Sequence, residues 1–316
     1  MRKIFLKPFS AQGNDYTELL RSELERFGDV LPLTRKACLF EAVRLKRDSI
    51  IILGWFENGV LDSNGAPSFF RLLFRLIAIV YLRIFVGRVI FIRHNNYPHA
   101  TKYNVSRAKF FVDILEMASS RSIVHCPEIK KKNRRYVPHP LYFSERIVGT
   151  RNDYFIFFGR ISRYKEIDVL MREFPTTKKL MIAGIVDDEA YVDELSVLIK
   201  ENIILMPGML DKNQARELVS NSAGLIVPNS GDDMIVSGSF FFGISCGVPV
   251  YAVNSPFFSW IEQQAPSLCV IADDIKMLCH KISLANSFYT FDIYDDAHRL
   301  FGEKAFVEGL TRVIKF

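Results

Sequence analysis

Two histidines lie five residues apart in the segment 93–99, Arg-His-Asn-Asn-Tyr-Pro-His. The segment follows a predicted buried strand, Arg88 to Ile92, and its composition excludes a regular helix that carries both histidines on one face. Catalytic groups collect on loops at the carboxyl ends of strands, where a neutral imidazole can accept a proton. His94 and His99 are therefore candidate catalytic bases, and a structural or solvated role is the alternative for each. No third residue has the spacing of a metal ligand, so we expect no metal site.

A strand, a polar loop and a helix start follow one another later in the chain. Leu225 to Val227 and Val248 to Val253 have the pattern of buried strands, and a helix is predicted to open between them at Ser237, Gly238 and Ser239. The unpaired amides of a first helical turn and the helix dipole both favour an anion. This stretch therefore predicts a phosphate site.

A carboxylate follows another predicted strand. Residues 48–56 form a nearly continuous apolar run, typical of a parallel strand buried on both faces, and Glu57 lies at its carboxyl end. Ligands bind outside those ends in open α/β sheets. Glu57 is thus a candidate site residue, with a solvated loop carboxylate as the alternative.

Residues 69–86 are predicted to form one helix of about five turns, because Pro67 precedes it and no breaker interrupts it. The helix is apolar almost all round. Its thin polar stripe is cationic, since Arg71 and Arg75 share one face and Arg83 lies about 80° away. One interpretation is a buried domain helix with snorkelling arginines. The interpretation we favour is a helix pressed into a membrane interface, with its arginines on anionic headgroups.

A basic run follows further along the chain and comprises Lys130, Lys131, Lys132, Arg134 and Arg135. No RNA-binding aromatic motif or helix-turn-helix pattern accompanies it, so a phosphate-rich membrane surface is a better partner than nucleic acid. Residues 1–150 hold 25 Lys and Arg against 13 Asp and Glu, or +12, which leaves 16 against 22, or −6, for the rest. The first half of the chain therefore suits an anionic surface.

The composition indicates an ordinary globular protein. An apolar fraction of 49% with 24% charged residues excludes disorder, and 316 residues suffice for two domains. The five cysteines are an odd, widely spaced set, which indicates reduced thiols in a cytosolic protein. We expect no signal peptide, since the first apolar run is short, and no membrane-spanning helix, since arginines interrupt the longest apolar run.

Strands alternate with helices along both halves, which predicts two doubly wound parallel-sheet, Rossmann-like domains of the α/β class. The stretch from Val137 to Asp153 has the character of a linker, so the predicted domains are 1–148 and 149–316. The tail, Asp296 to Phe316, has helical periodicity and is expected to pack on the first domain. No Gly-x-Gly-x-x-Gly motif follows a strand, which argues against a nicotinamide or flavin cofactor.

Several of these pieces, in this order, resemble bacterial glycosyltransferases of the two-domain GT-B architecture. The motifs are Asn14-x-Tyr16, Trp55-Phe56-Glu57, His94-Asn95 with Pro98-His99, Val137-Pro138-His139-Pro140, Gly159-Arg160 with Tyr164-Lys165-Glu166, and Ser237-Gly238 with Ser245-x-Gly247-x-Pro249-Val250. They cover nearly the whole chain, and the ordered set is more specific than any single motif. The chain looks most like enzymes of exopolysaccharide, capsule and O-antigen assembly, including the inverting mannosyltransferase of xanthan synthesis, and more distantly like glycosyltransferase family four.

The resemblance implies roles for residues of the second half. Arg160 and Lys165, which follow Gly159, match a basic pair that neutralises the donor diphosphate. A departing nucleoside diphosphate needs such charge stabilisation when no metal supplies it. The other residues matched to the donor site are Ser237, Gly238 and Ser239, at the diphosphate, and Leu210 and Asp211, at the base.

The first half is implied to bind the acceptor, and the reaction is expected to invert the anomeric carbon. Retaining relatives carry two glutamates eight residues apart, at positions that Met234 and Phe242 occupy here. An inverting displacement needs a base on the acceptor side. The candidates are His94 and His99, which match the acceptor-side histidine loop, with Asp15 and Glu57 in reserve.

We therefore expect a hexosyltransferase that moves a sugar from a UDP- or GDP-linked donor to a polyprenyl-diphosphate-linked or other lipid-linked saccharide. It would need no metal or other cofactor and bind no nucleic acid. It would act as a peripheral protein at the cytoplasmic face of the inner membrane, docking through the helix 69–86 and the basic run. Two alternatives stay open: an inactive GT-B-like scaffold and a basic nucleic-acid-binding protein.

Overall fold

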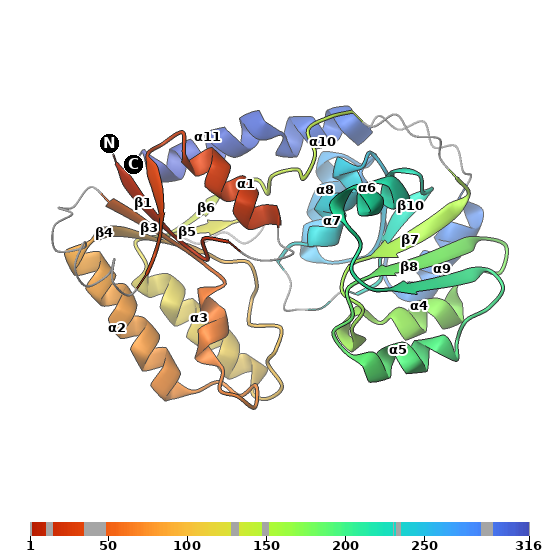
Figure 1. The fold of residues 1–316 in the computed structure, drawn as a ribbon, viewed down its shortest axis with the longest axis horizontal. Helices are drawn as coiled ribbons and strands as arrows, with labels where there is room; N and C mark the ends of the chain where they lie inside the picture. Colours follow the sequence, from red (N-terminus) through yellow and green to blue (C-terminus); the bar gives the residue numbers. More distant parts are fainter. Residues whose placement is uncertain are drawn as a thin grey trace. The chain divides into compact units, whose positions relative to one another are not determined.

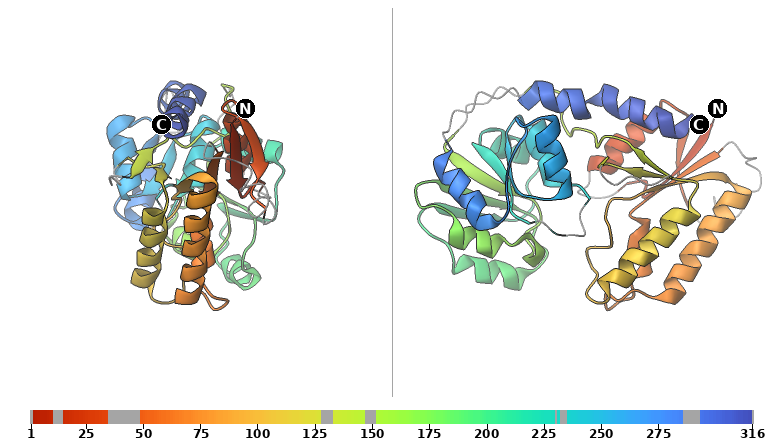
Figure 2. Two further views of the ribbon diagram at one scale, coloured as in Figure 1. Left: turned by 90° about the vertical axis from the view of Figure 1, so that its left-hand side faces the viewer. Right: turned by 180° about the vertical axis from the view of Figure 1, so that it is seen from behind.

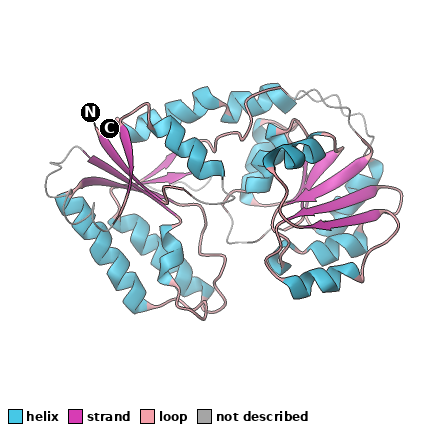
Figure 3. Cartoon of the chain, viewed as in Figure 1, coloured by secondary structure: helices cyan, strands magenta, loops and turns pink. Residues whose placement is uncertain are grey.

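The computed structural model describes residues 2–10, 15–34, 49–127, 133–146, 152–229, 231, 235–285 and 293–315. The chain divides into two compact units, each built around a six-stranded sheet (Figure 1, Figure 3). Unit 1 comprises Met1–Pro140, Asp232–Val236 and Glu303–Phe316, and unit 2 comprises Leu141–Gly231 and Ser237–Gly302. The predicted α/β class with two doubly wound parallel-sheet domains is confirmed.

The sheet of unit 1 has the strand order β2-β1-β3-β4-β5-β6, and its neighbouring strands are parallel. The strands are β1 (Lys3–Lys7), β2 (Asp29–Pro32), β3 (Ser49–Gly54), β4 (Gly87–Ile92), β5 (Arg121–Val124) and β6 (Arg134–Tyr136). β3 is buried along its whole length, as its apolar run predicts. Alternate residues face opposite layers of helices, Ile50 and Ile52 one layer, Ile51 and Leu53 the other.

Helices cover both faces of this sheet (Figure 2). They are α1 (Asp15–Leu24), α2 (Phe69–Phe85), α3 (Val105–Ala118) and α11 (Glu303–Ile314), and a 3-10 turn, η2 (Phe56–Val60), follows β3. α2 and α3 pack with the core on one face, and α1 and α11 pack with the core on the other. α2 matches the predicted helix to within one residue, and Ser68 caps it by accepting a hydrogen bond from the backbone N–H of Arg71.

The sheet of unit 2 has the order β12-β11-β10-β7-β8-β9, again with parallel neighbours. Its strands are β7 (Tyr154–Phe158), β8 (Lys179–Gly184), β9 (Ile203–Pro207), β10 (Gly224–Val227), β11 (Val250–Val253) and β12 (Cys269–Ala272). Counted from β7 as the first strand, this is the Rossmann order 3-2-1-4-5-6.

The helices of unit 2 form two layers. They are α4 (Ile167–Glu173), α5 (Glu189–Ser196), α6 (Lys212–Ser220), α7 (Gly238–Ser245), α8 (Pro256–Gln264), α9 (Ile275–Leu284) and α10 (Ile293–Phe301). α4, α5 and α9 pack on one face of the sheet in a single core. α7, α8 and α10 contact one another through a separate cluster of aromatic side chains. In this cluster the ring of Phe240 lies edge-on to that of Phe257, and the ring of Phe241 lies edge-on to that of Phe301.

The tail is helical, as its periodicity predicts, and forms two helices, α10 and α11, that are separated at Gly302. A Cβ on Gly302 would lie 2.5 Å from the carbonyl oxygen of His298, so only glycine fits this bend. Within the described residues, no helix is long and apolar enough to cross a membrane. The cysteines of the described part of the chain are buried and form no disulfides.

Candidate functional site

The strand order of unit 1 marks one place on its sheet for ligand binding. β1 lies between β2 and β3, so the next strand in the chain pairs with one edge of β1 and the strand after it pairs with the other edge. Ligands of open α/β sheets bind outside the carboxyl ends of the strands at such a topological switch point. His94, which follows β4, reaches toward this place. A Cβ on Gly54, at the end of β3, would lie 3.4 Å from His94 Nε2 and 3.7 Å from the carbonyl oxygen of Lys7, at the end of β1.

Five rings gather at the carboxyl edge of this sheet, and we call them the histidine cluster. They belong to Tyr16, Trp55, His94, His125 and His139. Tyr16 lies at the centre, with its ring centroid 4.9 to 5.8 Å from those of the other four. Trp55 and His94 are stacked, with centroids 3.9 Å apart and an interplanar angle of 4°. Apart from the partly exposed Trp55, the members are buried.

Hydrogen bonds to backbone carbonyls fix two of these imidazoles in one tautomer. Nδ1–H of His125 donates to the carbonyl oxygen of Val137 at 2.8 Å, and Nδ1–H of His139 donates to that of Pro140 at 2.8 Å. A carbonyl oxygen can only accept, so in the neutral ring Nε2 carries no proton. The hydroxyl of Tyr16 then donates to His125 Nε2 at 2.9 Å. The cluster thus presents proton acceptors to its interior.

Burial keeps the three imidazoles neutral. Desolvation lowers the pKa of His125 to about 4, and it lowers the pKa of His94 and of His139 well below their ordinary value, helped by the neighbouring histidines. The Nε2 atom of His94 is buried and has no hydrogen-bond partner among the described residues. No group of histidines, cysteines and carboxylates in the described part of the chain has the arrangement of a metal site. The neutral, buried Nε2 atom of His94 can accept a proton from a hydroxyl group.

The backbone at Trp55 is in an uncommon conformation. Its φ of 48° and ψ of 25° place a bulky residue in the left-handed region, where glycine is normally preferred. Such strain costs free energy and clusters at functional sites, where the surrounding structure holds it. Here it directs the chain from β3 into η2 and sets the indole against His94. Trp55 was not assigned a role from the sequence.

Glu57 lies in a different environment from the histidine cluster. It is fully buried, and neither carboxylate oxygen has a hydrogen-bond partner among the described residues. Desolvation raises the pKa of Glu57 to about 8, although the nearby N–H of its own backbone and the charge of Arg93 oppose the rise. The carboxyl group is therefore mostly protonated at pH 7. The alternative of a solvated loop carboxylate is wrong for Glu57.

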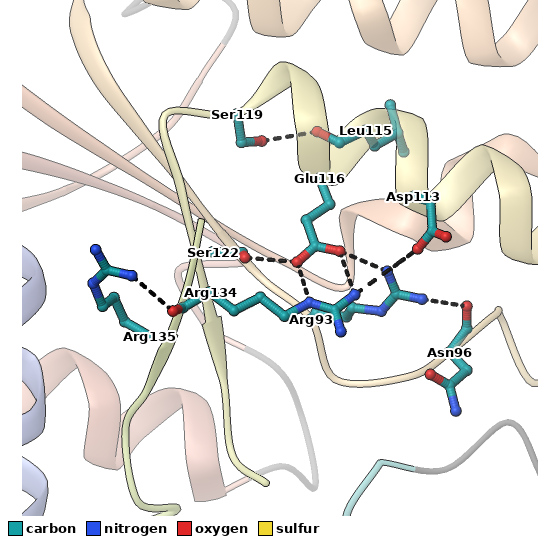
Figure 4. A network of polar contacts seen from close by, with 9 residues as sticks. All are labelled: Arg93, Asn96, Asp113, Leu115, Glu116, Ser119, Ser122, Arg134 and Arg135. Atoms are coloured by element: carbon teal, nitrogen blue, oxygen red, sulfur yellow. Dashed lines mark hydrogen bonds and ion pairs between the residues drawn. The ribbon is translucent and has the colours of Figure 1, made fainter. Parts of the chain in front are cut away.

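A buried ion network anchors the residue that precedes His94 (Figure 4). Arg93 donates to Glu116 at 2.7 Å, to Asp113 and to the carbonyl oxygen of Asn96 at 3.2 Å. Arg134 donates to both oxygens of Glu116 at 2.5 and 2.6 Å. Burial favours a higher pKa for Glu116, but the hydrogen bonds and charges of its partners outweigh this and lower its pKa to about 2. The network therefore holds the start of the histidine loop in place.

This network also corrects the expectation for Arg134. The sequence placed Arg134 in a basic run that faces a membrane, but its side chain is buried against Glu116. The charge is satisfied inside unit 1 and is not part of an exposed surface. Arg135 is exposed, and Lys130, Lys131 and Lys132 lie outside the described residues.

The remaining predicted residues of unit 1 are more dispersed. His99 is exposed on the loop after β4 and is not among the rings that surround Tyr16. Asp15 is the first residue of α1, next to Tyr16. Arg71 and Arg83 are exposed, and Arg83 donates to the carbonyl oxygen of Ala118 at 2.8 Å. Arg75 is half-buried and lies 4.4 Å from the centroid of the Phe56 ring.

Unit 2 brings several of the predicted donor residues to its own switch point, between β10 and β7. Ser237 caps α7 by accepting from the backbone N–H of Phe240 at 3.3 Å, as the sequence predicts for a helix start. Ser239 Oγ donates to the carbonyl oxygen of Phe158 at 3.0 Å, and a Cβ on Gly159 would lie 3.1 Å from that hydroxyl. The Gly159 loop and the first turn of α7, where Gly238 lies, are therefore adjacent.

Two basic residues follow Gly159, and their environments differ. Lys165 is buried, and its Nζ donates to Oδ1 of Asn229 at 3.3 Å, just beyond the end of β10. Arg160 is exposed and pairs with Asp187 at 2.6 Å. Lys165 is therefore a preorganised cation at the switch point, while Arg160 is held by a surface ion pair of small energetic value.

Leu210 and Asp211 precede α6. Asp211 is its N-cap, with the carboxylate accepting from the backbone N–H groups of Asn213 and Gln214 at 2.9 Å each. Gln214 completes a capping box by accepting from the N–H of Asp211 at 3.2 Å. The Asp211 side chain thus has a structural role in starting this helix.

The site members that received no catalytic or binding role from the sequence share one signal. Trp55 directly follows β3, His125 directly follows β5, and His139 comes three residues after β6. Parallel strands end at the same edge of a sheet, so aromatic and titratable residues immediately after successive strands must approach one another. Tyr16, the second residue of α1, is the corresponding residue after β1.

No protein-family model matches the chain, and no curated protein matches it in sequence. Solved structures do match it along its length. HepE from Anabaena, in complex with UDP, has a TM-score of 0.68 and 11% identity, with all of both chains covered.

A trehalose-phosphate synthase (UDP-forming) from Burkholderia xenovorans has a TM-score of 0.63 and 10% identity, again with both chains fully covered. AviGT4, a glycosyltransferase of avilamycin A biosynthesis, has a TM-score of 0.59 and 13% identity, covering 100% of this chain and 97% of its own. At such identities the likeness shows the fold, and the two units of this chain have the GT-B architecture.

Proposed function

We propose that this chain is a glycosyltransferase that moves a sugar from a nucleotide-sugar donor to a hydroxyl group of an acceptor saccharide. The observation that carries the proposal is His94, a neutral buried imidazole at the switch point of unit 1 whose Nε2 has no partner among the described residues. A neutral imidazole nitrogen can accept the proton of an attacking hydroxyl group. Lys165 and the first turn of α7 suit a diphosphate on unit 2.

The proposed reaction is a single displacement at the anomeric carbon. The acceptor oxygen forms a bond to this carbon while the bond from the carbon to the diphosphate oxygen breaks. The hydroxyl proton passes to His94 Nε2, and the electron pair of the broken bond leaves with the nucleoside diphosphate. Lys165, Arg160 and the amides at Ser237, Gly238 and Ser239 stabilise the charge that develops on the leaving group. Trp55 holds the plane of the imidazole by stacking.

Inversion of configuration follows from this scheme, and the surroundings of Phe242 support it. At the position where retaining relatives carry a glutamate, the ring of Phe242 packs against Phe158 at 4.7 Å and Phe143 at 5.5 Å between centroids. An aromatic ring cannot accept hydrogen bonds from sugar hydroxyls as a carboxylate does. The donor sugar is thus held differently in this chain.

The donor is proposed to be linked to UDP, with a GDP-linked sugar as the alternative. Among the structures that share the fold, HepE is in complex with UDP and the Burkholderia synthase is UDP-forming. Lys165 and the first turn of α7 can stabilise the negative charge of the departing diphosphate. We therefore propose a reaction without a metal ion or a further cofactor.

The acceptor is proposed to be a saccharide carried on a lipid, such as a polyprenyl diphosphate, in the assembly of a bacterial surface polysaccharide. The protein would then work as a peripheral protein at the cytoplasmic face of the inner membrane. The cationic balance of residues 1–150 supports this assignment, because both a lipid diphosphate and a bilayer of acidic lipids are anionic.

A thermal-shift panel with UDP, GDP, CDP, dTDP and NAD tests the donor part of the proposal, because a ligand that binds only the folded state raises the melting temperature. We expect a selective rise with UDP or GDP, followed by release of that diphosphate when the matching sugar donor and a lipid-linked acceptor are supplied. No shift with any diphosphate would refute the donor site. Binding without turnover across donors and acceptors would identify an inactive scaffold.

A further inference from the structure

Unit 1 carries a large exposed apolar surface on α2 and α3, which lie side by side on one face of its sheet (Figure 1, Figure 2). Eight large apolar side chains of α2 are between 48% and 69% exposed. They are Phe69, Phe70, Leu73, Phe74, Ile77, Val80, Ile84 and Phe85. Tyr103, Phe110 and Met117, in and before α3, are exposed to a similar degree. We call this surface the α2–α3 face.

The exposed residues of α2 form one stripe, since they recur every three or four positions. The opposite side of the helix, with Leu72, Ile79 and Leu82, packs into the sheet core. A surface helix of a globular protein normally turns polar residues outward, but α2 is apolar on both sides. Contiguous exposed apolar surface of this extent marks an interaction site.

The charges around the α2–α3 face have one sign. Between Asp62 and Asp113 the sequence holds eight Lys and Arg and no Asp or Glu. The acidic residues of α3, Asp113 and Glu116, are engaged with buried Arg93 and Arg134. The exposed cations of this stretch are Arg71, Arg83, Lys102, Arg107 and Lys109. Arg107 marks the junction of the two helices, with its guanidinium 5.5 Å from the centroid of the exposed Phe69 ring.

We propose that the α2–α3 face docks on an anionic lipid bilayer, with the apolar stripe of α2 at the acyl boundary and the flanking cations on the headgroups. A second copy of the chain is a poorer occupant, because a twofold interface would bring these cations together without acidic partners. Nucleic acid offers phosphates but no comparable apolar surface. Docking on a bilayer rests on the proposed function as far as that function places the protein at a membrane. The exposed apolar and cationic side chains that support it do not depend on sugar transfer.

Co-sedimentation of the full chain with vesicles tests the proposal, using phosphatidylcholine alone and phosphatidylcholine mixed with phosphatidylglycerol. We expect binding to the mixed vesicles that weakens as salt is added. The triple variant Phe70→Ser, Phe74→Ser and Ile77→Ser should lose binding by at least about tenfold. The variant Arg71→Glu with Lys109→Glu should lose the preference for phosphatidylglycerol. Val197→Ser with Leu284→Ser, which removes exposed apolar residues from unit 2, is the matched control and should bind like the wild type.

Circular dichroism and melting temperature establish that each variant is folded, and no nucleotide or acceptor is present in the assay. Unchanged vesicle binding by the folded triple variant would overturn the proposal. Failure of the wild-type protein to co-sediment with either kind of vesicle would also overturn it. A dimer in size-exclusion chromatography that the triple variant abolishes would assign the face to a second copy instead. A failed diphosphate shift with intact vesicle binding would refute only the donor site.

Discussion

The indole of Trp55 lies parallel to the imidazole of His94, with ring centroids 3.9 Å apart and an angle of 4° between the planes. The two residues follow adjacent parallel strands, β3 and β4, and Trp55 reaches this position through a left-handed backbone conformation. A strained residue that orients a neutral imidazole is the arrangement expected where a proton must be moved.

Replacing His94 with Gln should lower the turnover number by about 10²- to 10⁴-fold, the usual contribution of a general base. Donor affinity should stay within about twofold of the wild type, since the proposed diphosphate ligands belong to unit 2. Diphosphate release measures turnover, and calorimetric titration with the diphosphate measures affinity. The control is His280→Gln, at an exposed position on α9. Normal turnover in His94→Gln would remove this residue from the reaction.

Replacing Tyr16 with Phe should cost about 1–3 kcal/mol in the free energy of unfolding, because buried Nε2 of His125 loses its donor. The phenyl ring retains the contacts with the other four rings of the cluster. Tyr103→Phe, at an exposed site, should change stability by less than about 0.5 kcal/mol. Urea denaturation of both variants measures the difference. Equal stability would mean that the Tyr16 hydroxyl is not a required donor for His125.

Glu57 should make stability depend on pH in a way that Glu57→Gln abolishes. The pKa of Glu57 is raised to about 8 in the folded state from 4.5, so the folded chain holds its proton while the unfolded chain releases it. Stability is therefore unaffected below about pH 4.5 and falls as the pH rises toward 8.

At pH 7 the free energy of unfolding of the wild type is lowered by about 3 kcal/mol. Glu57→Gln should therefore be more stable than the wild type at pH 7 and nearly as stable as the wild type at pH 4.5. Denaturant titrations of both proteins across this range measure the difference. Destabilisation of Glu57→Gln at every pH would show that the ionised carboxylate has a partner in solution.

Replacing Lys165 with Ala should weaken diphosphate binding by about 10- to 100-fold, the value of a charge-assisted hydrogen bond of roughly 1.5–3 kcal/mol. Lys276→Ala removes an exposed lysine of unit 2 and serves as the control for a simple change of net charge. Affinities come from the same calorimetric titration. If Lys165→Ala binds as tightly as Lys276→Ala, the diphosphate contacts lie elsewhere in unit 2.

Much of the fold could be predicted because its signals are local. β4 matches the predicted strand Arg88 to Ile92 to within one residue, and α2 begins at Phe69, as predicted from the preceding Pro67. Ser237 caps α7 as its residue type predicts. Hydrophobic period, turn chemistry and capping act over a few residues, so the sequence carries them directly.

The sequence by itself determined the alternation of strands and helices, and with it the two parallel sheets and the loops on which functional residues lie. Only the tertiary structure decided which of those residues meet. The Tyr16 hydroxyl and His125 are 109 positions apart, and their hydrogen bond exists because parallel strands end at one edge of a sheet whose order the local pattern does not specify.

The tertiary structure likewise decided that Arg134 turns inward to Glu116, while the phenylalanines of α2 turn outward. Burial depends on what packs against a residue, and that information is not contained in the residues next to it in the sequence.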